Sequence, residues 1–367
     1  MAKLFVVGSH YQLITAINMA TTILSKEICD IILTDHSLGF DEISEKLNEG
    51  EVFRNAYYIE LNDFFNSVNK YKRFLIPIKH YGDYLLPANM NYDYDELIFS
   101  SSSKVMLFIF KKIHEVNNNA VWSKFEDGLV NYIEEDPLVG FTLKIRNFIY
   151  RKFHVDDFYS YKHFTYFYKP NLVIFEKNDV IGEMKQLSAL NENFKMKSIL
   201  KMLYPGVERV ANIEQYKFIF FEESYFADYD FNGDYKFISK FAKVVGHENI
   251  LVKLHPRNSK QNRFSEIGIN TISSVGIPWE AILFFAKLKD TQLLTLYSTS
   301  VLNTKLLFNM ENQVYFLFNC IGEEIPIRNK EKAENFLYSI VKNLDDESVV
   351  IPDNETDFYK KVGSIYE

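Results

Sequence analysis

The sequence predicts an α/β protein with two domains, and three observations support this fold class. The chain has 367 residues, which at roughly 150 residues per domain corresponds to about two domains. Its composition, 47% apolar and 25% charged, is that of an ordinary globular protein. Short β-rich runs alternate with helical patterns along the whole chain, which is typical of βαβ units and parallel sheets.

In the first half of the chain, the opening apolar run predicts a strand over residues 3–8 and a helix over 11–24. Leu13, Ile14 and Ile17 lie on the apolar side of that helix. A mostly helical stretch is expected over 184–203. Further strands are expected over 28–34, 56–61, 96–101, 120–125 and 172–175.

A second series of strands and helices follows, so the domain boundary is expected near Tyr204, Pro205 and Gly206. The predicted domains are residues 1–205 and residues 206–367, each Rossmann-like. Helices of the second domain are expected over 237–245 and 279–288. Its strands are expected over 216–221, 249–254, 270–275, 292–297 and 313–319.

Charge and cysteine content exclude several classes of protein. The net charge of −8, from 41 basic and 49 acidic residues, argues against nucleic acid as a partner. Cys29 and Cys320 stand far apart without a CxxC pair or ligand-spaced histidines, so neither a disulfide framework nor a zinc site is expected. No run of about 18 apolar residues predicts a spanning helix, and polar residues interrupt the N-terminal apolar run before a signal sequence forms. We therefore expect a cytoplasmic protein.

Two doubly wound domains facing each other across a cleft place the loops at the carboxyl ends of their strands around one crevice, where ligands bind in such folds. This is the GT-B architecture of glycosyltransferases, whose outline phosphorylases, some epimerases and periplasmic-type binding proteins share. Gly8, Ser9, His10 and Gln12 follow the first strand and lead into a helix N-terminus, which suits an anion or a sugar hydroxyl. A simple turn with an N-cap is the alternative.

An acidic pair before glycine follows the fifth expected strand. Glu126 and Asp127 precede Gly128, and a carboxylate presented there is suited to accept a proton from an incoming hydroxyl. A capped turn is the structural alternative. Glu222 and Glu223 end a strand of the second domain and compete with Asp127 for the role of base, or bind the acceptor.

Two strand-end segments of the second domain suit a phosphate. His255, before Pro256 and between Lys253 and Arg257, can donate to a phosphate and offset charge on a leaving group. A hydroxyl cluster then leads into a helix expected near Val301, where hydroxyls and backbone N–H groups form an uncharged phosphate cradle. The cluster consists of Ser298, Thr299 and Ser300. A structural histidine and an ordinary helix cap are the alternatives.

Taken in this order, the acidic pair with glycine, the His-Pro pair and the Ser/Thr motif resemble the bacterial sialyltransferases. The resemblance is to glycosyltransferase family 52, of lipooligosaccharide and capsule type, with the bacterial polysialyltransferases as relatives. It implies that Asp127 is the general base, that Glu126 and Gly128 shape its loop, and that Glu280 faces the nucleotide ribose. First-turn stabilisation of a helix is the alternative for Glu280. The donor-binding residues that it implies are His255, Pro256, Glu280, Ser298, Thr299 and Ser300, and the acceptor-side or loop residues are Gly8, Ser9, His10, Gln12, Glu126 and Gly128.

The activity that the resemblance implies is inverting and metal-independent. N-acetylneuraminic acid would pass from CMP-Neu5Ac, bound by the second domain, to a galactose-terminated glycan on the first, in capsule or lipooligosaccharide synthesis. No cofactor or metal is expected, because the nearest DxD, Asp228 to Asp230, is interpreted as a solvated loop. The alternatives are a GT-B glycosyltransferase using another nucleotide sugar and a non-catalytic glycan-binding protein of the same fold.

Residues 141–169 carry six basic and two acidic residues, a net charge of +4, interleaved with eleven Phe and Tyr residues. One interpretation is peripheral contact with the inner face of the cell membrane, where anionic lipids attract such a segment. The other is a helical excursion that packs its rings in a domain or homodimer interface.

Overall fold

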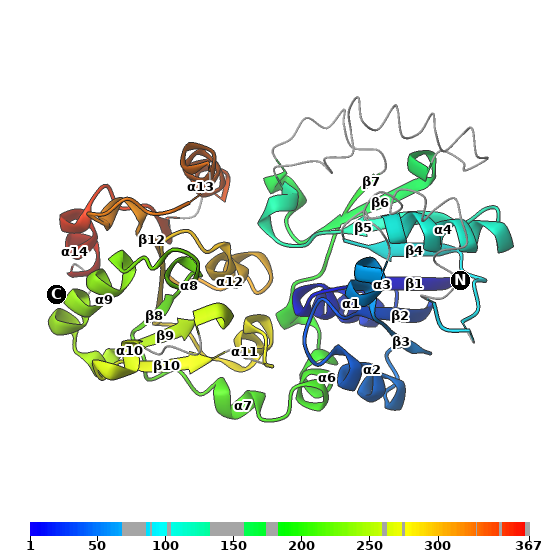
Figure 1. The fold of residues 1–367 in the computed structure, drawn as a ribbon, viewed down its shortest axis with the longest axis horizontal. Helices are drawn as coiled ribbons and strands as arrows, with labels where there is room; N and C mark the ends of the chain where they lie inside the picture. The colour runs from blue at the N-terminus through cyan, green and yellow to red at the C-terminus, as the bar shows by residue number, and fades with distance from the viewer. Residues whose placement is uncertain are drawn as a thin grey trace. The chain divides into compact units, whose positions relative to one another are not determined.

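The structure is a computed structural model that describes residues 1–67, 86–88, 90–100, 104–132, 158–173, 183–258, 263–273, 276–327, 329–344 and 347–363. The chain divides into two compact units, Met1–Leu203 and Tyr204–Glu367. Each unit is built around one sheet of parallel strands with helices between them (Figure 1). The predicted α/β class is confirmed, with two parallel sheets.

The described residues of the first unit form seven strands in the order β3-β2-β1-β4-β5-β6-β7. Its central strands are buried runs such as Leu4 to Val7, because helices cover both faces of a parallel sheet. The strands expected near residues 3–8, 28–34, 56–61, 96–101 and 120–125 are all present. The bounds are β1 (Ala2–Val7), β2 (Ile28–Thr34), β3 (Ala56–Ile59), β4 (Glu96–Phe99), β5 (Val121–Phe125), β6 (Lys162–Phe167) and β7 (Glu183–Gln186).

The helices of this unit connect neighbouring strands. The chain runs from β1 to β2 and β3 on one side, then returns with β4 on the other side of β1. The strand order therefore reverses between β1 and β4, which is where ligands bind in doubly wound sheets. The helices are α1 (His10–Thr21), α2 (Phe40–Glu49), α3 (Leu61–Ser67), α4 (Lys104–Val116) and α6 (Met196–Leu203), with 3-10 turns η3 (Leu129–Tyr132), η4 (Phe158–Tyr161), η5 (Pro170–Leu172) and η7 (Leu190–Glu192).

Two expectations for the end of this unit differ from the structure where it is described. Leu172, at the start of the strand expected over 172–175, ends a 3-10 turn that begins at Pro170, whose ring restricts φ and removes a ladder donor, and residues 174–175 lie outside the described part. The stretch 184–203, expected to be mostly helical, contains one α-helix, α6, and its first three residues belong to the strand β7. The sheet instead gains β6, where three consecutive buried residues suit a strand next to β5.

The aromatic segment 141–169 is also different from its helical interpretation where it is described. Residues 158–169 form η4, β6 and the residues that follow, and residues 141–157 lie outside the described part. Phe158 stacks on Trp122, with ring centroids 4.5 Å apart and planes inclined by 6°. Tyr166, Phe167 and Tyr168 are buried as well. In the described part, these rings therefore contribute to the core of the first unit.

Where the second unit is described, it has six strands in the order β10-β9-β8-β11-β12-β13. Its middle strand β8, with the sequence FIFF, is buried at every position and pairs with β9 and β11. All five strands expected in this half are present, and β13 adds a sixth. The bounds are β8 (Phe218–Phe221), β9 (Ile250–Leu254), β10 (Asn270–Ser273), β11 (Gln292–Thr295), β12 (Val314–Phe316) and β13 (Val349–Val350).

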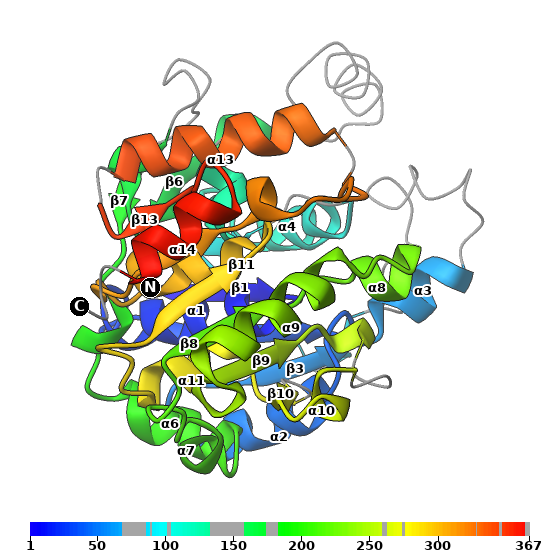
Figure 2. The same cartoon turned by 90° about the vertical axis from the view of Figure 1, so that its left-hand side faces the viewer.

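The helices around this second sheet are held by aromatic contacts. Phe358 of α14 lies with its ring centroid 5.7 Å from Phe237 and 5.2 Å from Phe241, so that α14 packs against α9 (Figure 2). The helices are α7 (Val207–Val210), α8 (Tyr225–Tyr229), α9 (Gly233–Val245), α10 (Arg263–Glu266), α11 (Trp279–Phe285), α12 (Asn303–Leu306), α13 (Lys330–Leu344) and α14 (Glu355–Gly363), with 3-10 turns η8 (His247–Asn249), η9 (Pro256–Asn258), η10 (Thr299–Leu302) and η11 (Phe318–Cys320).

Cys29 and Cys320 are both buried free thiols. Burial raises the pKa of each thiol to about 12, so both are protonated and unreactive at neutral pH. In the described part of the chain, no helix is long and apolar enough to cross a membrane.

Candidate active site

The loop after β1 is tied to the loop after β5. Ser9 caps α1 by accepting from the backbone N–H of Gln12 at 3.2 Å, and Gly8 N donates to Gln12 Oε1 at 2.6 Å. The other end of the Gln12 amide, Nε2, donates to Asp127 Oδ2 at 2.7 Å. The structure thus brings Gly8, Ser9 and Gln12 together with Asp127, which is more than a hundred residues away from them in sequence.

Asp127 stands at the rim of this region. The residue is exposed overall, yet partial burial of its carboxyl raises its pKa, against the opposing effect of hydrogen bonds from Gln12 and Ser9. Its backbone N–H donates to the side chain of Asn131, and Gly128 turns the chain with φ 84°, a left-handed conformation that favours glycine. Asp127 is therefore a held, accessible carboxylate with a pKa shifted toward that of a useful base.

Glu126 is buried beside Asp127, and both of its carboxyl oxygens have donors. Tyr11 OH donates to Oε1 at 2.5 Å, and the Tyr132 hydroxyl and the Tyr168 backbone N–H, at 2.9 Å, donate to Oε2. Burial raises the pKa of Glu126 to about 7, although all three donors act in the opposite direction. Sequence reasoning missed the three tyrosines, since only folding brings α1, η3 and the end of β6 together.

His10, the remaining residue of the first motif, is half-buried and packs against α2. Its ring meets Phe40 edge-on, with centroids 4.9 Å apart. Burial lowers the pKa of His10 to about 4, so the ring is neutral at physiological pH.

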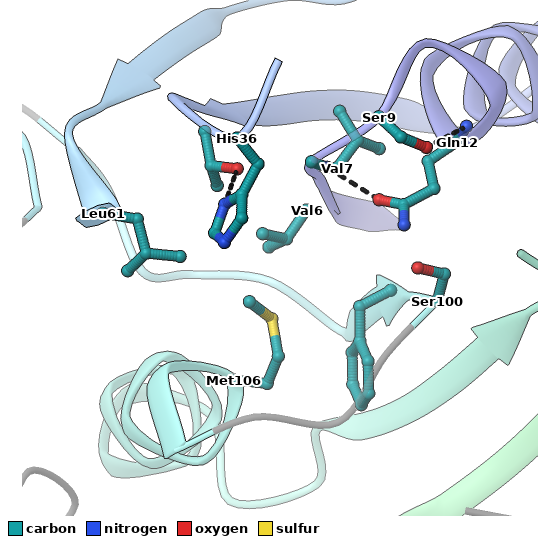
Figure 3. A pocket seen from close by; sticks show the side chains of 11 residues that line it. Val6, Val7, Ser9, Gln12, His36, Leu61, Ser100 and Met106 are labelled. Carbon is teal, nitrogen blue, oxygen red and sulfur yellow. Dashed lines mark hydrogen bonds between the residues drawn. The ribbon is translucent and has the colours of Figure 1, made fainter. Parts of the chain in front are cut away.

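A pocket of about 270 Å³ opens between β1 and β4 (Figure 3). Its polar lining comes from the ends of β1, β2 and β4, including His36, whose Nδ1 is 2.9 Å from the Thr34 hydroxyl oxygen. Its apolar side comes from β1, β4, α3 and α4. The lining residues are Val6, Val7, Gly8, Ser9, Gln12, Thr34, His36, Leu61, Phe99, Ser100 and Met106. Only Gly8, Ser9 and Gln12 were predicted.

In the second unit, three adjacent strands end in polar side chains. β8 leads to Glu222 and Glu223, β9 leads to His255, and β11 leads to the motif that begins at Ser298. The backbone N–H of His255 donates to Glu222 Oε2 at 3.2 Å, and the backbone N–H of Tyr297 donates to Glu223 Oε1 at 2.6 Å. β8 thus links the His-Pro and Ser/Thr segments at one edge of the sheet.

His255 is held as a neutral hydrogen-bond donor. The backbone N–H of Arg257 donates to His255 Nδ1 at 3.2 Å, which leaves the proton of the neutral ring on Nε2. Burial, together with Arg257 and Lys253, lowers the pKa of His255 to about 4. Pro256 begins the turn η9 that follows. The neutral ring therefore offers an uncharged N–H to a hydrogen-bond acceptor at this point.

The nearby DxD sequence does not form a loop. Tyr225–Tyr229 is the short helix α8, and Asp228 accepts from Arg257 Nη1 at 2.8 and 2.7 Å. Asp230 ends this helix in a left-handed conformation. In the described residues, no group of three or more His, Cys, Asp or Glu side chains is placed to hold a metal ion.

The Ser/Thr motif forms a half-exposed turn before the helix. Ser298 and Ser300 hydroxyl oxygens lie 2.8 Å apart, and the Ser298 N–H donates to the Thr295 hydroxyl at 3.0 Å. The helix expected near Val301 is instead the 3-10 turn η10, which starts at Thr299 and continues into α12. The motif presents hydroxyls at the end of β11.

The two glutamates after β8 differ. Glu222 accepts from Arg263 Nη2 at 3.1 Å inside a buried ion-pair network with Asp234, which is a structural role. Glu223 Oε1 also accepts from the Thr295 hydroxyl, whereas its buried Oε2 has no partner among the described residues. Burial raises the pKa of Glu223 to about 7.

Glu280 lies in the first turn of α11 and is 8% exposed. Asn303 Nδ2 donates to its Oε1 at 2.6 Å. Burial raises the pKa of Glu280, and the charge of nearby Lys253 opposes that rise. The carboxyl of Glu280 is therefore hydrogen-bonded to α12 and is not open to solvent.

Comparison with known proteins decides the family. The family model of the alpha-2,8-polysialyltransferases (POLYST) matches residues 3–316, which include every strand from β1 to β12. The chain belongs to the alpha-2,8-polysialyltransferase family. This polysialyltransferase-family chain is accordingly a sialyltransferase that uses CMP-Neu5Ac and a glycan acceptor. The expected sialyltransferase activity is confirmed at this level, and the narrower assignment to glycosyltransferase family 52 stays a prediction.

Solved structures show the fold of this polysialyltransferase-family chain. The UDP-GlcNAc 2-epimerase from Methanocaldococcus jannaschii is 14% identical with a TM-score of 0.54, and the match covers 99% of this chain and 92% of that one. Arabidopsis thaliana UGT89C1, complexed with UDP, is 11% identical with a TM-score of 0.52, covering 99% and 89%. At these identities the likeness concerns the fold alone, which is GT-B. No curated protein sequence matches the chain significantly.

Proposed function

We propose that this protein is an inverting, metal-independent sialyltransferase that acts in the cytoplasm in capsule or lipooligosaccharide synthesis. It transfers N-acetylneuraminic acid from CMP-Neu5Ac to a galactose-terminated glycan. The observation that carries this proposal is the family match over both units together with Asp127, an accessible carboxylate held by Gln12 at a strand end of the first unit. Residues 1–205 form the acceptor side and residues 206–367 the donor side.

Asp127 is the general base in this proposal. Its carboxylate takes the proton of the acceptor hydroxyl as that oxygen attacks the anomeric carbon of the sialyl donor. The hydrogen bonds from Gln12 and the turn at Gly128 keep the carboxylate in place, and partial burial makes it more basic than an ordinary aspartate. A single displacement inverts the configuration, and no covalent enzyme intermediate is needed.

The donor-side residues stabilise the departing CMP. His255 donates from Nε2 to the donor phosphate, and the hydroxyls of Ser298, Thr299 and Ser300 bind other oxygens of that phosphate. Leaving-group charge grows in an oxocarbenium-like transition state, so donors already in position lower its energy without reorganisation. Because these groups supply the electrostatic stabilisation, we propose that no metal is required. Pro256 fixes the turn after His255, and Glu280 supports the nucleotide site from below through Asn303.

A second acceptor is favoured by the description of the family. The family name specifies alpha-2,8-polysialyl transfer, which would make a sialic-acid-terminated glycan the acceptor. Asp127 would serve as base for either hydroxyl. Product analysis with both acceptor types decides between them.

Contact with the inner membrane face or with a second copy of the chain stays a prediction. It was based on residues 141–169, and the described residues of that segment contribute rings to the core of the first unit. Such contact would therefore depend on residues 141–157, which lie outside the described part.

The experiment that tests the proposal is release of CMP from CMP-Neu5Ac in the presence of EDTA, with lactose or sialyllactose as the acceptor. Wild-type protein is expected to turn over in EDTA and to yield a sialylated product, whose linkage NMR identifies. Asp127→Ala is expected to lose turnover, and Asp127→Asn, which keeps the shape of the side chain, is expected to lose it as well.

Two results would overturn the proposal in different ways. Loss of all turnover in EDTA, with recovery on adding Mg²⁺, would contradict metal independence. Stabilisation by a UDP-sugar or GDP-sugar, with none by CMP, would favour a glycosyltransferase with another donor. A non-catalytic glycan-binding protein would bind glycan equally well after Asp127→Ala and His255→Ala and would release no CMP at all.

A further inference from the structure

We propose that the pocket between β1 and β4 is an acceptor subsite that takes the N-acyl group of an amino sugar. This inference rests on the proposed function, since it needs an acceptor hydroxyl at Asp127. The pocket was not anticipated from the sequence, and its apolar side comes from elements with no predicted functional residue. It would decide which glycans the enzyme sialylates.

The pocket adjoins the candidate base through shared residues. Gln12 lines the pocket and donates to Asp127 Oδ2 at 2.7 Å, while Ser9 lines it and hydrogen-bonds toward the same carboxyl. Figure 3 shows Ser9, Gln12 and Ser100 on one side of the space and Leu61, His36 and Met106 around the rest. A sugar with its reacting hydroxyl at Asp127 therefore has a neighbouring substituent at the mouth of this pocket.

The size of the pocket limits what it can hold. Pockets for drug-sized ligands usually measure roughly 300–1,000 Å³, and this one measures about 270 Å³. A nucleotide sugar is too large for that space, whereas one sugar ring or a substituent of it fits. The pocket is thus suited to part of the acceptor and not to CMP-Neu5Ac.

The lining selects a group with an apolar end and a polar stem. Leu61, Phe99 and Met106 are buried and offer no hydrogen bonds from their side chains, so a sugar hydroxyl directed against them would lose its water partners. A methyl group gains from the same burial. Ser9, Gln12 and Ser100 supply polar atoms at the other side, which suit the amide of an N-acyl group.

The test compares acceptors that differ only in this substituent. In the first arm, N-acetyllactosamine and lactose differ in an acetamido group on the second sugar. In the second arm, acceptors ending in N-acetylneuraminic or N-glycolylneuraminic acid differ by one hydroxyl on the acyl methyl. We expect the N-acetyl acceptor to be preferred in kcat/KM by roughly tenfold in the arm whose sugar enters the pocket.

A pocket variant sharpens the comparison. Met106→Gln keeps the length of the side chain and its helix propensity but places an amide among the apolar lining residues. It should reduce the preference for the N-acetyl acceptor. Met202→Gln, the same change on helix α6 away from the pocket, is the matched control and should leave that preference unchanged.

The outcomes separate failure of this inference from failure of the proposed function. Equal kcat/KM for both members of each acceptor pair in the wild type overturns the subsite, even if Met106→Gln does not fold. Turnover of CMP-Neu5Ac with every acceptor then still upholds the sialyltransferase proposal. Absence of CMP release with any acceptor or with water would overturn the proposed function itself.

Discussion

Glu126 in the first unit and Glu223 in the second both lie just after a buried strand, and they have different environments. Glu126 follows β5 and Glu223 lies two residues after β8, and burial raises the pKa of each to about 7. Both oxygens of Glu126 accept hydrogen bonds, two of them from tyrosine hydroxyls. Glu223 uses one oxygen, and its Oε2 has no partner among the described residues. A buried glutamate at a strand end is therefore fully bonded in one unit and half-bonded in the other.

The difference teaches where each unit does its chemistry. In the first unit the neighbouring Asp127 is accessible, and the bonded Glu126 braces its loop across α1, η3 and β6. In the second unit, His255 and the Ser298 motif are neutral hydrogen-bond donors, and Glu223 sits between them. This contrast supports the proposal that the first unit accepts a proton and the second donates hydrogen bonds to an anion.

The largest effects are expected when the candidate base of the first unit and the candidate hydrogen-bond donor of the second unit are removed in separate variants. Asp127→Ala is expected to lower kcat by roughly 10²–10⁴-fold while the Kd for CMP stays unchanged. His255→Ala should lower kcat by roughly 10²–10³-fold and also raise the Kd for CMP, because in the proposed mechanism its Nε2–H donates to the phosphate of the leaving group. Isothermal titration with CMP and steady-state kinetics measure both. If Asp127→Ala raised the Kd for CMP and His255→Ala left that Kd unchanged, the assignment of the two units would be reversed.

A pH profile tests whether Glu126 braces the base. Both oxygens of Glu126 accept hydrogen bonds, so a proton on this carboxyl would displace one of the donors and disturb the loop that holds Asp127. We therefore expect kcat to fall as the pH drops below about 7, the pKa of this carboxyl. Glu126→Gln should remove that limb and lower the plateau by roughly tenfold to 100-fold through misplacement of Asp127. Tyr132→Phe removes one donor to the ionised form and should move the limb to higher pH. An unchanged profile in both variants would show that Glu126 acts on folding alone.

The smallest effect concerns stability. Folding raises the pKa of the Glu223 carboxyl from near 4.5 to about 7. The protein therefore loses stability as the pH rises from about 4.5 to about 7, because the folded state holds this proton more tightly than the unfolded state. Glu223→Gln should therefore raise Tm relative to the wild type at about pH 8, by roughly 2–4 °C for each kcal/mol recovered, and leave it unchanged at about pH 5. Glu222→Gln is the control and should lower Tm at both pH values, since Arg263 loses a buried partner. Thermal scans at both values decide this.

Local patterns predicted some elements well and others poorly. The strand over residues 28–34 and the buried run of β8 could be predicted because apolar β-formers stand between turn residues. The strands β6 and β7 could not, since β6 is rich in aromatics that also suit a helix or a surface, and only its partner β5 settles the matter. The two-residue strand β13 carries too little pattern to be seen.

The candidate site divides in the same way. Asp127, His255 and Ser298 could be found because polar residues directly after buried strands lie at the ligand-binding edge of a parallel sheet. Tyr132 and Tyr168 could not, because their contact with Glu126 closes only when η3 and β6 pack. The resemblance predicts that Glu280 faces the nucleotide ribose. Its hydrogen bond from Asn303 could not be predicted, because periodicity carries no information on contacts between α11 and α12.

By itself the sequence determined the α/β class, the succession of most strands and the residues at their carboxyl ends, because those depend on short-range hydrophobic patterns. Only the tertiary structure decided which of these residues share a hydrogen bond, which carboxyls lose their water, and where the pocket beside Gln12 opens. Desolvation and hydrogen bonding depend on neighbours more than a hundred residues away, such as Tyr11 and Glu126. Local sequence carries no information about such distant neighbours.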